Sequence, residues 1–206
     1  MGRCLELSRI AVQKGEYPFA TIIALEGKIV AEAINRTVRD GDVTRHAEVI
    51  ALSQAQKTLC RKDLRRYTLY TNVEPCAMCS FCIREAWIGR VVYALASPVM
   101  GGMSKWNILR DDSMSDRIPQ IFGPVPQIVS GLLAREAQLA WQDWNPLAWH
   151  LIKRLGLLMD PCTDEGNACI HHGHRHSFWQ TLQMCLERNS KTQAKGTTLN
   201  ASNVDL

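Results

Sequence analysis

The strongest constraint on the fold is a regular alternation of strand-like and helix-like segments that begins at residue 67. Strand patterns over 67–73, 89–95 and 127–130 alternate with helix patterns over 75–87 and 103–110. Consecutive strands that are separated by helices pair in parallel through crossover connections. This part of the sequence therefore predicts parallel strands with helices packed on the faces of their sheet.

The segments on either side of this alternation add two strands and more helices. A helix is expected over 3–13, strands over 18–25 and 28–34, a loop over 35–45, and helices over 46–59 and 132–144. The turn residues Glu26-Gly27 predict a hairpin between the first two strands, and Asn145-Pro146 predicts the end of the last helix. The sequence thus predicts an α/β fold, a three-layer α/β/α sandwich around a mixed five-stranded sheet.

The composition fits one globular domain with an appended tail. With 206 residues, 46% of them hydrophobic, the chain can bury a sizeable core without disulfide staples. We expect the domain to cover 1–150. The C-terminal extension, 151–206, is expected to be mostly disordered because it ends in a stretch rich in Ser, Thr, Asn and Lys. Its HHGHRH run at 171–176 is expected to bind metal only adventitiously.

The distribution of charge and apolar residues bears on location and partners. We find no secretory signal and no apolar run of the roughly 18 residues that a membrane helix needs. We therefore expect a cytoplasmic protein with no membrane partner. The formal net charge is +4, which permits a polyanionic partner without requiring one. The basic connector at Arg61, Lys62, Arg65 and Arg66 is expected to be a solvated face, with a phosphate contact as the alternative.

Two short motifs, each at the start of a predicted helix, carry the chemistry. The first is His46-Ala47-Glu48, and the second is Pro75-Cys76-Ala77-Met78-Cys79. Cysteines three positions apart share one face of a helix, with Cβ atoms about 5–6 Å apart, which suits two thiolates on one tetrahedral Zn²⁺. His46 supplies a third ligand, and a fourth position left for water is typical of catalytic zinc. Glu48 is then free to move protons.

Either motif alone is weak evidence. A lone histidine or glutamate at a helix start is usually a surface residue, and a lone Cys-x-x-Cys pair fits a closed structural zinc site or a redox pair equally well. The order H-x-E followed by P-C-x-x-C, however, is the signature of the zinc nucleobase deaminases. Cys82 extends the run to three cysteines, but we expect it to be a small buried apolar residue.

The sequence resembles the cytidine deaminase-like superfamily, most closely its branch of guanine deaminases, bacterial tRNA adenosine deaminases and nucleoside deaminases. The resemblance covers about residues 3–145. It rests on PFATII (18–23), Asn35-Arg36, TRHAEVIAL (44–52), LYTNVEPCAMC (69–79), IGRVVYAL (88–95) and GGMSKWNIL (101–109). The chain differs from the usual pattern at Ala20-Thr21, where the family has Gly-Ala, and in a longer, proline-punctuated loop over 110–127. We expect Ala20-Thr21 to tighten the floor of the pocket.

The resemblance implies a set of site residues and an assembly. The implied roles are zinc ligation by His46, Cys76 and Cys79, proton transfer by Glu48, a side-chain contact to the substrate base by Asn35, and main-chain contacts at Ala47 and Pro75. Phe19 and Trp106 fall in segments that the resemblance places near the pocket, so they are candidates to line the base. One Zn²⁺ per subunit and a homodimer are also implied.

The leading functional hypothesis is a zinc-dependent hydrolase that converts an exocyclic amine of a nucleobase or nucleoside to a carbonyl and releases ammonia. The modest net charge and the loop over 110–127 favour a small-molecule substrate. The alternative within the same class is adenosine-to-inosine deamination of tRNA, with the base flipped out of its loop. A non-catalytic zinc-binding partner subunit is the alternative from another class, and Glu48 argues against it.

Overall fold

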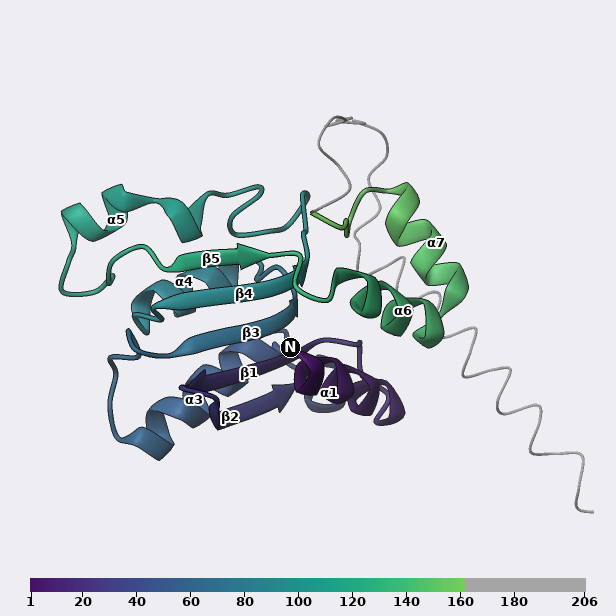
Figure 1. The fold of residues 1–206 in the computed structure, drawn as a ribbon, viewed down its shortest axis with the longest axis horizontal. Coiled ribbons are helices and arrows are strands. Elements are labelled where there is room, and N and C mark those ends of the chain that lie inside the picture. The colour runs from purple at the N-terminus through teal and green to yellow at the C-terminus, as the bar shows by residue number, and fades with distance from the viewer. Residues whose placement is uncertain (162–206) are drawn as a thin grey trace, which may run out of the picture. The chain divides into compact units, whose positions relative to one another are not determined.

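The computed structural model describes residues 1–161, and it has a single five-stranded sheet in that range (Figure 1). The strands, in spatial order, are β2 (Lys28–Ile34), β1 (Ala20–Leu25), β3 (Thr68–Val73), β4 (Arg90–Leu95) and β5 (Gln127–Ser130). Strand β1 is antiparallel to both β2 and β3, whereas β3, β4 and β5 are mutually parallel. The mixed sheet and the parallel second half are therefore confirmed.

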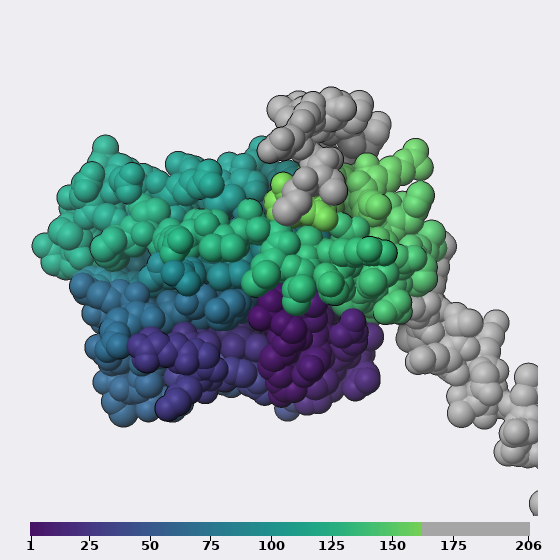
Figure 2. All heavy atoms as spheres, viewed as in Figure 1, coloured from purple at the N-terminus to yellow at the C-terminus, as the bar shows by residue number. Residues whose placement is uncertain are grey.

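Helices cover both faces of this sheet. These helices are α1 (Gly2–Gln13), α3 (Ala47–Leu59), α4 (Ala77–Glu85) and α6 (Ala134–Trp144), and a further helix, α7 (Pro146–Arg154), packs on α6. Helices α3 and α4 lie behind the sheet in Figure 1, and α1 and α6 lie side by side on the opposite face, as Figure 2 also shows. The three-layer α/β/α arrangement that the sequence predicts is the one observed.

Alternation along the central strands divides the core between the two faces. Ile23 and Leu69 pack with Leu52 of α3 and Ile83 of α4, all of them nearly or fully buried. The neighbouring residues in β1, such as Ile22, point the other way and pack against α1. Because successive side chains of a strand alternate between faces, this division fixes which strand residues lie under α3 and α4.

A cluster of aromatic rings packs between α6, α7 and the residue that precedes β1. Trp141 is fully buried, and its ring meets those of Phe19 and Trp144 edge to face at centroid distances of 5.1 and 5.5 Å. The ring of Trp149 on α7 is tilted against it at 6.5 Å. Edge-to-face pairs add to the stabilisation from burial alone. The cluster therefore joins α6 and α7 to the residue that precedes β1.

Two short helices lie where the sequence predicts loops. Helix α2 (Thr37–Asp40) falls within the expected loop 35–45, and the buried carboxylate of Glu16 accepts the backbone N–H groups of Val38 and Arg39. Helix α5 (Asp112–Arg117) begins where the Asp111 side chain accepts the N–H of Ser113. Both helices depend on side-chain acceptors for their first N–H groups.

The helix expected over 103–110 is wrong for most of its length. Turns occupy its first part, and a 3₁₀ helix, η1, covers only Ile108–Arg110. The backbone N–H groups of Met103 and Ser104 donate to the carboxylate of Glu74. Because this tertiary contact fixes residues 103 and 104 in the turn, local helix propensity does not decide the structure there.

The chain continues as a helix where Asn145-Pro146 predicts only an end. Asn145 terminates α6 and also caps α7, since its side chain accepts the N–H of Ala148, and Pro146 takes the first helical position. Beyond α7, Met159 exchanges backbone hydrogen bonds with Ala96 at 2.8 and 3.0 Å. The proposed boundary at 150 stays a prediction, and most of the extension, including HHGHRH, lies outside the described residues.

Candidate metal centre and active site

The three expected metal ligands come together at the starts of two helices. His46 is the N-cap of α3, Cys76 is the N-cap of α4, and Cys79 lies in the first turn of α4. His46 Nδ1 lies 3.5 Å from Cys76 Sγ and 3.4 Å from Cys79 Sγ, and the two sulfurs are 3.6 Å apart. Among the described residues, this is the group of three metal-binding side chains that the structure brings together.

The geometry and chemistry of these donors fit zinc. With Zn–S bonds of about 2.3 Å and a Zn–N bond of about 2.0 Å, tetrahedral angles require S···S of about 3.8 Å and S···N of about 3.5 Å. The observed separations lie within about 0.2 Å of both values. One imidazole and two thiols form a donor set that binds zinc in preference to harder cations, which favour oxygen ligands. His46, Cys76 and Cys79 can therefore hold Zn²⁺ with Nδ1 as the histidine donor.

Glu48 lies beside these ligands and is almost completely buried. Its Oε2 is 3.5 Å from Cys79 Sγ, and its Oε1 accepts a hydrogen bond from Thr71 Oγ1 at 3.4 Å. Burial raises the pKa of the Glu48 carboxyl, and the nearby His46 opposes this rise. A buried carboxyl next to a metal site, with its pKa raised above the ordinary value, is suited both to accept and to return a proton.

Without metal, the ligands share their protons unequally. The hydrogen bond with Cys79 lowers the pKa of Cys76 to about 4, although burial opposes this shift. The same contact, together with burial, raises the pKa of Cys79. For His46, burial favours the neutral ring, but the hydrogen bond to Cys76 and the charge of Glu48 outweigh it and raise the pKa. The site thus has one sulfur ready to ligate as a thiolate.

Of the residues expected to contact substrate through polar atoms, Ala47 and Pro75 directly adjoin the metal-binding residues His46 and Cys76 in the chain. Asn35 follows β2 and is buried, with its side-chain amide donating to Thr37 Oγ1 at 2.7 Å. Ala47, the first residue of α3, is fully buried. The Pro75 carbonyl accepts the N–H of Gly102 and the hydroxyl of Ser80. Their roles toward a substrate remain predictions.

The two aromatic candidates differ in environment. Phe19 is half-buried and packs edge to face against Trp141 in the aromatic cluster. Trp106 is 57% exposed, in the segment that follows the Glu74-bound turn. Either ring still has a surface available to a ligand. Their roles as base-lining residues also remain predictions.

Sequence reasoning missed two residues that organise the site. The buried carboxylate of Glu74, directly before Pro75, accepts backbone N–H groups from residues 97, 103 and 104 and the hydroxyl of Ser104. Thr71, on β3, donates to Glu48. The position of Glu74 directly before the cysteine motif could have marked it as a site residue. No sequence pattern marks Thr71, because Glu48, to which it donates, is 23 residues away in the sequence.

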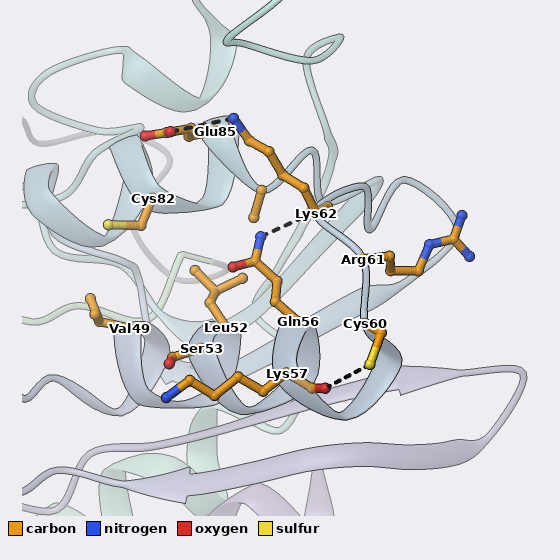
Figure 3. A pocket seen from close by; sticks show the side chains of 11 residues that line it. Val49, Leu52, Ser53, Gln56, Lys57, Cys60, Arg61, Lys62, Cys82 and Glu85 are labelled. Atoms are coloured by element: carbon orange, nitrogen blue, oxygen red, sulfur yellow. Dashed lines mark hydrogen bonds and ion pairs between the residues drawn. The ribbon is translucent and has the colours of Figure 1, made fainter.

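A separate groove of about 710 Å³ runs along the outer sides of α3 and α4 (Figure 3). It is lined by Val49, Leu52, Ser53, Gln56, Lys57, Cys60, Arg61, Lys62, Cys82, Glu85 and Ala86. Lys62 pairs with Glu85 across it at 3.4 Å. Cys82 is partly buried and packs against the core, so the expectation of a small buried apolar residue is only partly met. The groove contains none of the three metal-binding side chains.

Other connector cations are also paired. Arg65 contacts Asp63 at 2.8 Å and lies over the ring of Trp87 at 4.8 Å, and Arg66 contacts Glu26 at 3.3 Å. These contacts fit the solvated face that the sequence analysis favours. No helix in residues 1–161 is both long enough and apolar enough to cross a membrane.

Comparison with known sequences places these residues in a family. Residues 1–95, which include all three metal-binding side chains and Glu48, match the cytidine and deoxycytidylate deaminase zinc-binding region. A tRNA-specific adenosine deaminase of Aquifex aeolicus is 33% identical over 60% of this chain and 82% of its own length. A probable cytosine deaminase of Schizosaccharomyces pombe is 36% identical over 57% of this chain and 67% of its own. This chain is also 35% identical to a tRNA(Ile)-lysidine synthase of Deinococcus radiodurans, but it spans only 22% of the length of that protein.

Solved structures show the same fold. One, from work on A-to-I editing by tRNA deaminases at the wobble position, is 30% identical with a TM-score of 0.59, over 66% of this chain and 94% of that one. A guanine deaminase of Nitrosomonas europaea is 26% identical with a TM-score of 0.55, over 70% of this chain and 82% of that one. The similarity therefore includes relatives that act on RNA and relatives that act on free bases.

Proposed function

This chain belongs to the cytidine deaminase-like superfamily, and on that basis we propose that it is a zinc-dependent hydrolytic deaminase of a nucleobase or nucleoside. The observation that carries the proposal is the convergence of His46, Cys76 and Cys79 beside a buried Glu48. A closed structural zinc site would need a fourth protein ligand and would have no use for a buried carboxyl at its edge.

The chain's own residues account for the proton transfers. Zn²⁺ held by His46, Cys76 and Cys79 would supply a water whose pKa is about 7 instead of about 15.7. Glu48 Oε2, the oxygen on the side of Cys79, would accept one proton of that water and pass it to the ring nitrogen of the substrate as the water oxygen bonds to the amine-bearing carbon. Glu48 would then take the second proton from that oxygen and give it to the amine, so that the C–N bond breaks, ammonia leaves and a carbonyl remains. Burial, by raising the Glu48 pKa, favours the protonated state between these transfers.

Asn35 and the pocket walls would orient the base. We propose that the Asn35 side chain and main-chain groups at Ala47 and Pro75 fix the heterocycle, with Phe19 and Trp106 against its ring. Contacts of this kind position the reacting carbon for attack, and positioning is itself a large part of catalysis. The pairing of Lys62, Arg65 and Arg66 with acidic side chains reduces the charge available to an RNA backbone, which favours a small substrate.

Adenosine in tRNA is the second candidate substrate. It is supported by the relatives, because tRNA-specific adenosine deaminases recur among those matched. An RNA substrate would require the target base to leave its stack and enter the pocket. It would also give binding that weakens steeply with salt.

One experiment separates these possibilities. Zinc-loaded protein is incubated with guanine, cytosine, adenine, their nucleosides and an anticodon stem-loop, and released ammonia is measured. Ammonia from a free base or nucleoside supports the first proposal, and ammonia from the stem-loop alone supports the second. Stoichiometric zinc without ammonia from any of them would contradict both and favour a non-catalytic partner subunit. Homodimer formation and a cytoplasmic location stay predictions.

A further inference from the structure

Beneath Glu48, the sheet carries a short row of residues that includes two buried hydroxyls. Strand pairing places Thr21 of β1 opposite Ala33 of β2 and Thr71 of β3, and Thr71 opposite Tyr93 of β4. Thr21 is two residues before Ile23, and Thr71 is two residues after Leu69, whose side chains both pack under α3 and α4. Since strand side chains alternate between faces, Thr21 and Thr71 point to the face that carries the metal centre.

The hydroxyls of Thr71 and Thr21 differ in their hydrogen-bond partners. Thr71 is 1% exposed, and its Oγ1 donates to Glu48 Oε1. Thr21 is fully buried, and its Oγ1 has no hydrogen-bond partner within residues 1–161. Both side chains have the same shape and lie on the same face of adjacent strands. Thr68, at the start of β3, points to the opposite face of the sheet and provides a matched comparison for Thr71.

We infer that Thr71 is a positioning residue for Glu48, an inference that rests on the proposed deaminase function. Its hydroxyl holds Oε1 and thereby keeps Oε2 turned toward Cys79 and the metal centre. A carboxyl that must collect a proton on one side and deliver it on the other needs its rotation restricted. The Oγ1–Oε1 distance of 3.4 Å is long, but hydrogen bonds of this kind commonly shorten when an active site is occupied.

The alternative is that Thr71 serves only to fill space in a strand. β-Branched residues suit strands in general, and valine has nearly the same shape as threonine. If the methyl groups alone matter, Thr71→Val would change neither catalysis nor the position of Glu48. The substitution therefore separates the hydroxyl from the packing.

Kinetics on the full chain test the inference with the substrate from which the wild type releases ammonia. We expect Thr71→Val to lower kcat about tenfold with KM within about twofold of wild type and full zinc content, since an interaction that acts in the chemical step affects kcat. Thr71→Ser, which keeps the hydroxyl, should retain kcat within about threefold. Thr68→Val, the same change at the start of β3 on the opposite face of the sheet, is the matched control and should leave kcat and KM within about twofold. Equal kinetics for Thr71→Val and Thr68→Val would overturn the inference.

Two further comparisons keep the result decisive. If Thr71→Val does not fold, Thr71→Ser and Thr71→Ala replace it, and kcat must be about tenfold higher for serine than for alanine. Crystal structures of the zinc-loaded variants give a readout independent of turnover. The Glu48 carboxylate should be rotated or poorly ordered in Thr71→Val and unchanged in Thr68→Val. An inactive wild type would contradict the proposed function, whereas an unmoved Glu48 in Thr71→Val would contradict the role of Thr71.

Discussion

The carboxylate of Glu74 occupies the space that a side chain at Gly101 would need. A Cβ at Gly101 would lie 2.1 Å from Glu74 Oε1, well inside any real contact distance. Gly101 also pairs with Cys76 in an isolated β-bridge. The backbone at Gly101 is therefore in direct contact with the start of α4, where the metal-binding cysteines lie. Because three backbone N–H groups hold the carboxylate, it cannot move aside without losing them.

Gly101→Ala should therefore be destabilising. The methyl group must displace Glu74 and leave buried N–H groups without an acceptor, a loss of about 2–3 kcal/mol in the free energy of unfolding. Urea denaturation of the two proteins measures this difference. Gly2→Ala is the control, since a Cβ at Gly2 meets no atom within 4 Å, and it should leave stability unchanged or slightly raised. An equally stable Gly101→Ala would show that the loop does not depend on Glu74.

Replacement of Glu48 should separate metal binding from turnover. Glu48→Ala keeps all three candidate ligands, so we expect stoichiometric zinc. Loss of proton transfer should reduce kcat by at least about 10²–10⁴-fold. Glu85→Ala is the matched control, because Glu85 is an exposed residue of α4 that pairs only with Lys62 among the ion pairs of the described residues. Near-normal ammonia release by Glu48→Ala would show that another group moves the proton.

The sequence predicts those parts of the site that depend on the spacing of residues within one helix. His46 and Glu48 share one helix start, and Cys76 and Cys79 share the next, so each pair is fixed by helix geometry alone. That the two helix starts converge follows from crossover connections to one sheet. The contact between Thr71 and Glu48 depends on the exact depth of α3 over β3, which no local pattern encodes.

Prediction of the fold from local sequence is limited in the same way, as the short helices show. Helix α7 had a local signal, because Asn145-Pro146 is as typical of a helix start as of a helix end. Helix α5 had one too, in the capping residue Asp111. Helix α2 had none, because Glu16, which accepts its N–H groups, lies 22 or 23 residues earlier in the chain. Short elements of this kind are stabilised by distant side chains and not by their own propensity.

Zinc binding should depend on Cys79 and not on Cys82. Both cysteines lie on α4, but only Cys79 belongs to the cluster of metal-binding side chains. We expect Cys79→Ser to weaken zinc binding by at least about a hundredfold, because a neutral hydroxyl replaces a thiolate ligand. Cys82→Ser, the same change one turn further along, should bind zinc as the wild type does. Competition with a chromogenic chelator measures both affinities, and equal losses in the two variants would remove Cys79 from the site.

Stability should respond to pH through the ion pair between α1 and β2. Arg3 donates two hydrogen bonds to the Glu32 carboxylate, at 2.7 and 3.1 Å, and these lower the pKa of Glu32. A carboxyl whose pKa is lower in the folded state stabilises the fold above its unfolded-state pKa, and this contribution is lost as the pH falls through the folded-state value.

Glu32→Gln should therefore cost about 0.5 kcal/mol near neutral pH, within the range for exposed ion pairs. The difference from wild type should shrink as the pH falls below the unfolded-state pKa of Glu32 and through its lower folded-state pKa, because the wild-type carboxyl then also becomes neutral. Glu26→Gln is the comparison, because Glu26 and Arg66 are more exposed and joined by one longer contact of 3.3 Å, so its cost should be smaller at every pH. Urea unfolding at several pH values tests this, and a Glu32→Gln cost independent of pH would mean that the charge of Glu32 does not stabilise the contact between α1 and β2.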